Sequence, residues 1–162
     1  MARSGGLEEH HYEVTVRWTG NLGEGTTGYK KYSRNHEIEA PGVPKLLGSA
    51  DPTFHGDESR WNPEQLLLTA LTQCHMMSYF HIASAAGVVV TEYTDHAEGT
   101  LKLNRDGSGE FIAATLHPRV VVAAEDQIEL ALTLHRDAAG ACFIGRSVNF
   151  PVKHEPEITV AA

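Results

Sequence analysis

The segment of residues 63–86 constrains the fold more than any other part of this sequence. Asn62 is a suitable N-cap, Pro63 fits the first helical position, and Glu64 favours the first turn through the helix dipole. Gly87 is suited to the left-handed conformation that follows many helices. The helix between these signals is apolar nearly all round, which is typical of a helix buried in the middle of a protein. Polar residues interrupt it too often for a membrane span.

Strand-like segments lie on both sides of this helix. Residues 12–18 alternate apolar and polar side chains, as a half-buried strand does. Further strands are predicted at 29–33, 36–40, 88–103 and 110–123, a second helix at 125–141, and a last strand between 142 and 160. The order β-β-β-α-β-β-α-β predicts an α+β fold with antiparallel sheets packed on a long central helix.

Length and charge limit the class of protein. A chain of 162 residues predicts a single domain, which we place at 12–162 after a loose leader at 1–11. The proline- and glycine-containing stretch 41–61 is expected to be a folded loop that covers a site. A formal net charge of −8 argues against nucleic acid and anionic membranes as partners. No apolar signal segment is visible, so the predicted location is the cytoplasm.

Cys74 stands near the middle of the apolar segment 66–80, and three interpretations of it are open. A free cysteine is often a small buried hydrophobe. Cys74 and His81 are about two helical turns apart and share a helix face, so with Cys142 they form an alternative metal site. The third interpretation is a reactive thiol, which requires a nearby cation or hydrogen-bond donors. Position and spacing alone do not choose among the three.

Two motifs carry a more specific signal. The sequence NPEQLLLTALTQCHM, which begins at Asn62, is followed much later by CFIGRSVNFPV, which begins at Cys142. Together they resemble the OsmC/Ohr family of thiol-dependent peroxidases, and the predicted element order fits that family's fold. The resemblance implies a homodimer that reduces organic or inorganic hydroperoxides without a metal or organic cofactor.

The resemblance also implies a role for each matching residue. Cys74 is the expected peroxidatic cysteine, and Cys142 is the resolving cysteine that forms a disulfide with it. An external thiol or dithiol then restores the pair. Glu64 matches the family glutamate that holds an arginine beside the reactive sulfur. Our choice for this arginine is Arg34, and Arg17 and Arg60 are the alternatives.

Two alternatives to a peroxidase remain at this stage. The first is a stress-associated binding protein of the same fold with weak or no peroxidase activity. The second is the metal-binding domain that uses Cys74, His81 and Cys142. His75 and His81 are expected to be interior polar groups with hydrogen-bond partners, because burying an unpaired polar side chain costs a few kcal/mol.

Overall fold

The computed structural model describes residues 8–162, so most of the predicted leader lies outside the described residues. The chain forms two compact units, of which the first ends at Glu64 and the second runs from Gln65 to Ala162. A single domain over 12–162 therefore stays a prediction. Within the described part of the chain, no helix is long and apolar enough to cross a membrane.

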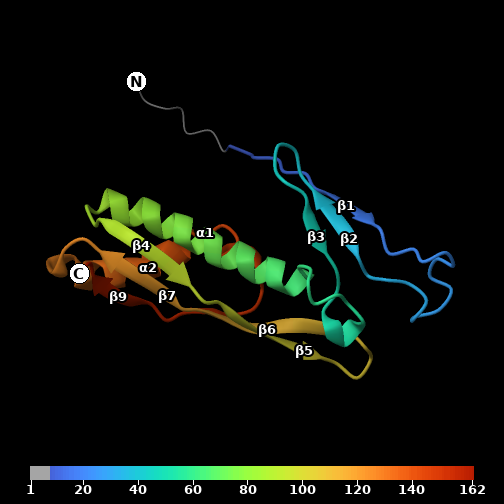
Figure 1. Cartoon of the computed structure of the whole chain (residues 1–162). Coiled ribbons are helices and arrows are strands. Elements are labelled where there is room, and N and C mark those ends of the chain that lie inside the picture. The colour runs from blue at the N-terminus through green and yellow to red at the C-terminus, as the bar shows by residue number, and fades with distance from the viewer. Residues whose placement is uncertain (1–7) are drawn as a thin grey trace. The chain divides into compact units, whose positions relative to one another are not determined.

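The first unit contains a three-stranded antiparallel sheet of β1 (Thr15–Trp18), β2 (His36–Glu39) and β3 (Leu46–Gly48) (Figure 1). A short 3-10 helix, η1, follows at Pro52–Phe54. The loop predicted at 41–61 is thus folded, and it supplies a strand that the sequence did not predict.

The strand predicted at 29–33 is wrong, because these residues form turns. Arg34 explains the difference. Its guanidinium donates hydrogen bonds to the carbonyl oxygens of Tyr32 and Tyr29, at 2.7 and 2.6 Å. It also lies over both tyrosine rings, 4.1 and 4.4 Å from their centroids. The backbone curves around the guanidinium, and a curved backbone cannot continue a strand ladder.

Helix α1 runs from Pro63 to Ala85, close to the predicted bounds. Gly87 has a φ of +79°, as expected of the residue that ends the helix. The buried residues repeat every four positions and therefore form one stripe: Leu71, His75, Tyr79 and Ala83. Met77, on the other side of α1, is 56% exposed. Within this single chain, α1 is therefore buried along one face rather than all round.

The second unit contains two three-stranded sheets. One has the order β4-β7-β9 and the other the order β5-β6-β8. The strands of the first are β4 (Val90–Asp95), β7 (Pro118–Val122) and β9 (Glu157–Val160), and those of the second are β5 (Glu98–Leu103), β6 (Gly109–Leu116) and β8 (Val152–His154). β8 and β9 pair in parallel with β6 and β7, so each of these sheets combines antiparallel and parallel pairs.

Four strands, where two were predicted, separate the helices. Each long strand-like segment is broken: the first at 96–97, the second at His117, and the C-terminal one at 155–156. At the second break, the backbone N–H of His117 donates to Oδ1 of Asp95 at 2.8 Å, in place of a ladder partner. Pro156 has no N–H to donate. The breaks divide one long arrangement of strands into two sheets.

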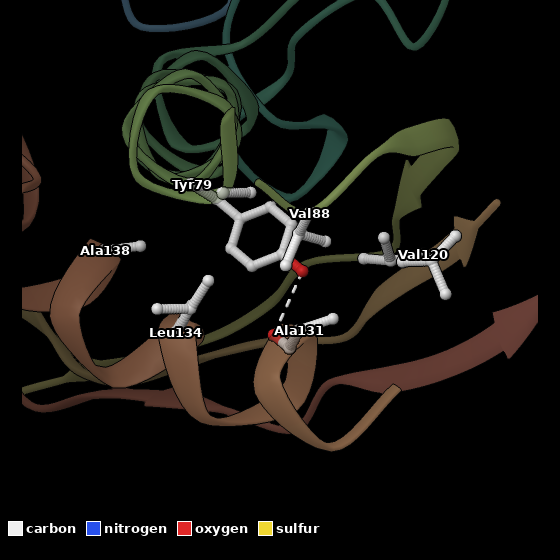
Figure 2. Close-up of a cluster of buried hydrophobic side chains, with 8 residues drawn as sticks. Tyr79, Val88, Val120, Ala131, Leu134 and Ala138 are labelled. Atoms are coloured by element: carbon white, nitrogen blue, oxygen red, sulfur yellow. Dashed lines mark hydrogen bonds between the residues drawn. The ribbon is translucent and has the colours of Figure 1, made fainter. Parts of the chain in front are cut away.

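The main core lies between the two helices and the sheet β4-β7-β9. α2 (Ile128–Ala141) follows the 3-10 helix η2 (Glu125–Gln127), and a third, η3 (Gly145–Ser147), comes after it. The core side chains come from α1, β7 and α2, together with Val88 (Figure 2). The hydroxyl of Tyr79 donates to the carbonyl of Ala131 at 3.0 Å, which satisfies the one polar atom that Tyr79 brings into this core.

Candidate active site

Two elements of the second unit bring Cys74 and Cys142 together. Cys74 lies halfway along α1 and is half-buried, and Cys142 directly follows the last residue of α2 and is 3% exposed. Both are free thiols, and Cys74 is close enough to influence the pKa of the Cys142 thiol. The sequence placed Cys142 at a helix end, but only the packing of α2 beside α1 makes the two thiols neighbours.

The thiol of Cys142 is protonated at neutral pH. Burial raises the pKa of the Cys142 thiol to about 11, and the hydrogen bond with Cys74 acts in the same direction. Backbone N–H groups of Gly145 and Ile144 oppose this shift, and the N–H of Gly145 lies 3.3 Å from the sulfur. Burial wins, so Cys142 is a protonated thiol at neutral pH. Its S–H can donate a hydrogen bond to a neighbouring sulfur.

Three histidines from three elements meet next to Cys74. Nε2 of His75 on α1 lies 3.0 Å from Nδ1 of His135 on α2, so one ring donates to the other. The ring of His154 on β8 packs on His75 with 4.3 Å between centroids. The ring of Tyr79 stacks on His135 at 3.9 Å. The sequence singled out His75, but it gave no signal for His135 and His154.

Burial keeps this histidine cluster neutral. It lowers the pKa of His75 to about 3 and that of His135 to about 4, and the other histidines of the cluster add to the effect. Burial also lowers the pKa of His154, although nearby Asp95 opposes the change. The cluster therefore places no positive charge beside the thiols at neutral pH.

His75 and His81 were both expected in the interior, and their observed environments differ. His75 is fully buried and bonded through Nε2, as expected, but its Nδ1 has no hydrogen-bond partner within residues 8–162. His81 was expected in the interior and is exposed, which corrects that expectation. Its position explains the error, because it follows the buried Tyr79 by two residues and so points away from the buried stripe.

Arg34 and Glu64 belong to the first unit. The guanidinium of Arg34 is engaged by the carbonyls and rings of Tyr29 and Tyr32, and no ion pair joins it to Glu64 in the part of the chain that the structure describes. Oε2 of Glu64 is buried without a hydrogen-bond partner among these residues. A buried carboxylate oxygen without a donor is costly, and a cation would satisfy it. The roles of both residues stay predictions.

The alternative arginines are also in the first unit. Nε of Arg60 lies 3.6 Å from a carboxylate oxygen of Asp57, and its Nη1 donates to the carbonyl of His36 at 3.4 Å. Arg17 stands opposite Glu37 in the β1–β2 register, where opposite charges attract. Each of the three candidate arginines thus has a partner within its own unit.

Cys142 also lines a cavity of about 200 Å³. Arg146 and His154 line it, together with the apolar side chains of Leu116, Phe150 and Val152. Arg146 did not emerge from the sequence as a functional residue. The available signal was its position, four residues after Cys142, which is about one helical turn.

The metal-binding alternative finds no support in the geometry. Across residues 8–162, no group of three or more His, Cys, Asp or Glu side chains is placed to hold a metal ion. Cys74, His81 and Cys142 were the proposed ligands, and His81 lies on the exposed side of α1.

Comparison with known proteins identifies the family and the fold. Residues 56–157 match the protein-family model OsmC, described as OsmC-like protein. YmaD of Bacillus subtilis is 22% identical over 157 residues, which cover 95% of this chain and 97% of YmaD. An OsmC-like protein of unknown function from Vibrio cholerae is 30% identical and superposes with a TM-score of 0.82, covering 92% of this chain and all of that one.

A more distant structure shares the fold. It is an organic hydroperoxide resistance protein OsmC from Legionella pneumophila, with a TM-score of 0.68 at 15% identity over 94% of this chain and 99% of that one. The family-model match spans well over half of the sequence and includes both cysteines and Glu64. The chain therefore belongs to the OsmC-like protein family.

Proposed function

We propose that the protein is a thiol-dependent peroxidase that reduces organic or inorganic hydroperoxides through Cys74 and Cys142. The observation that carries the proposal is the proximity of two free thiols, one half-buried on α1 and one buried at the end of α2. Cys74 is the less buried of the two, which supports it as the thiol that meets the hydroperoxide, and Cys142 supplies the second thiol.

The proposed reaction has three steps. The Cys74 thiolate attacks the terminal oxygen of the hydroperoxide, the O–O bond breaks, and an alcohol or water leaves after taking a proton. The Cys74 sulfenic acid then condenses with the Cys142 thiol, which releases water and forms a disulfide. Two external thiols, or one dithiol, reduce the disulfide and are themselves oxidised. The chemistry needs no metal or organic cofactor.

We propose the cytoplasm as the location, because its thiol pools can supply the reductant. The Legionella protein, whose name says organic hydroperoxide resistance, has the same fold and supports a hydroperoxide as the substrate class. Arg34 remains our choice for the arginine that activates Cys74, with Glu64 to position it. The buried oxygen of Glu64 that lacks a donor supports a cation there.

One equivalent of an organic hydroperoxide is expected to lower the mass of the protein by two hydrogens. Digestion under non-reducing conditions should then map this change to a Cys74–Cys142 bond, because the thiols are already neighbours. Peptide mass spectrometry before and after treatment measures both. An unchanged mass, with both thiols still open to alkylation after unfolding, contradicts the proposal.

A second candidate is a stress-associated binding protein of the same fold with weak or no peroxidase activity. One observation favours it: the guanidinium of Arg34 is held by Tyr29 and Tyr32 rather than by Glu64. The same mass-spectrometric experiment separates the two candidates, because the binding protein would leave the hydroperoxide unreduced.

We also propose a homodimer that covers the exposed side of α1. Met77 and Phe80 are 56% and 38% exposed, and a cavity of about 350 Å³ beside Phe80 is lined further by Val88, Val89 and Val90. Exposed apolar side chains grouped in this way are typical of an interface.

Replacing Phe80 with aspartate is expected to convert the dimer to a monomer. A charge on a buried apolar interface is costly, so association should weaken by a factor of about one hundred or more. Sedimentation equilibrium at micromolar concentration gives the mass of each species. The matched control is Leu132→Asp, a similarly exposed leucine on α2, which should stay dimeric. A wild-type mass of 17.7 kDa at every concentration contradicts the dimer.

A further inference from the structure

The cavity next to Cys142 is in contact with only one of the two cysteines. Cys142 is part of its wall, and Cys74 is not. Its volume of about 200 Å³ is that of roughly seven water molecules at about 30 Å³ each, which suits a small organic thiol. Arg146 is on the wall and is exposed, so the cavity is accessible from solvent at that residue.

We propose that this cavity is the docking site for the thiol that reduces the Cys74–Cys142 disulfide, and that Arg146 selects thiols that carry a negative charge. The inference rests on the proposed function, because it requires that disulfide. It assigns an attack site, a charge preference and a recognition residue to the external reductant.

Arg146 is suited to bind an anion in this cavity. Its backbone N–H donates to the carbonyl of Cys142 at 3.0 Å, so the turn that carries it is fixed relative to the sulfur. Within residues 8–162 its side chain has no hydrogen bond or ion pair, so its five donors remain available. A guanidinium whose donors are available can bind a carboxylate through two parallel hydrogen bonds.

No other positive charge on the wall competes with Arg146 at neutral pH. His154 is the second titratable base on the wall, and burial lowers its pKa, so its ring is neutral. The chain as a whole carries a formal net charge of −8 and does not attract anions by its overall field. A preference for an anionic thiol must therefore come from Arg146.

The position of the cavity determines which sulfur is attacked. The incoming thiolate reaches Sγ of Cys142, forms a mixed disulfide with it, and Cys74 leaves as the thiolate. A second thiol attacks the reductant sulfur of the mixed disulfide and releases the Cys142 thiolate, which takes up a proton. The N–H groups of Gly145 and Ile144 stabilise that leaving thiolate. The disulfide gains two electrons, and the two reductant sulfurs lose them as a new disulfide.

The test compares three small thiols on the oxidised protein. The disulfide is formed with diamide, which does not depend on the peroxide reaction, and is then reduced with 3-mercaptopropionate, 2-mercaptoethanol or cysteamine. Each rate constant is expressed per thiolate. It is then divided by the rate constant with which the same thiol reduces hydroxyethyl disulfide, which removes differences in intrinsic nucleophilicity among the three thiols. The readout is the loss of the disulfide after acid quench and alkylation.

For the wild type we expect 3-mercaptopropionate to react about ten times faster than 2-mercaptoethanol, and cysteamine to be slowest. Arg146→Gln should bring the three corrected rates together, while Arg146→Lys should keep part of the preference. Arg136→Gln removes the same charge from an exposed position on α2 and should change nothing. The mercaptopropionate adduct trapped early should lie on Cys142.

Equal preferences in the wild type and Arg146→Gln would overturn the inference, as would an early adduct on Cys74. Failure of diamide to form the disulfide would overturn it as well. If the diamide-formed disulfide shows the charge preference but hydroperoxide does not oxidise the protein, the proposed function fails and the docking site stands.

Discussion

Replacing Cys74 with serine is expected to lower the rate of hydroperoxide consumption by roughly a thousandfold or more, since the nucleophile is lost. A serine hydroxyl cannot take the place of a thiolate in attack on the O–O bond. The variant should fold normally, because Cys74 is half-buried and serine is of similar size. A coupled assay for residual hydroperoxide gives the rate, and thermal unfolding confirms the fold.

Cys142→Ser is the matched control for this prediction, because it removes the same kind of group from the other side of the pair. It should consume one equivalent of hydroperoxide and then stop, with Cys74 trapped as a sulfenic acid. Dimedone labelling followed by peptide mapping locates that product. Full steady-state activity in Cys74→Ser would contradict the assignment, and dimedone on Cys142 of that variant would exchange the roles of the two cysteines.

Acidification from pH 6.5 to pH 5 is expected to lower the free energy of unfolding by about 3 kcal/mol. The folded-state pKa values of His75 and His135 are about 3 and about 4, below the unfolded value of about 6.5. Above pH 6.5 both states are neutral, and their contribution to stability is fully present. Below it the unfolded chain takes up protons that the folded protein does not bind, so stability falls with a slope that approaches about 1.4 kcal/mol per pH unit for each histidine near pH 5.

Urea unfolding at several pH values between 7 and 5 measures this slope. Burial also lowers the pKa of His154, which adds to the slope. The exposed carboxylates whose pKa values are lowered, such as those of Asp51 and Asp57, titrate below this window. Nearby Asp95 raises the pKa of His154 and so reduces its share.

His135→Gln should reduce the slope by about 1.4 kcal/mol per pH unit, whatever its effect on stability at pH 7, because it removes one buried titrating group. His81→Gln is the control, since His81 is exposed, and it should leave the slope unchanged. The same slope in the wild type and His135→Gln would show that the buried cluster does not govern acid sensitivity.

Local signals in the sequence predicted the elements that depend on near neighbours. The run from Asn62 to Gly87 contains a start signal, an uninterrupted apolar segment and a stop signal, and α1 follows these bounds closely. The strand bounds were harder to predict, because the alternation of apolar and polar residues continues through His117, whereas the strand itself ends at Leu116 and a new one begins at Pro118. The parallel pairing of β8 and β9 depends on segments far apart in the sequence, and no local pattern encodes it.

The sequence by itself determined the family, the long helix and the two candidate reactive cysteines, because these depend on residue identity and on spacing along the chain. Only the tertiary structure decided what surrounds them. Packing of α2 and β8 against α1 brings His135 and His154 to His75, and burial in that contact removes their charge. The same packing places Cys142 beside Cys74 and leaves Arg146 on a cavity wall. Burial and charge proximity depend on contacts between distant segments, and those contacts exist only in the folded chain.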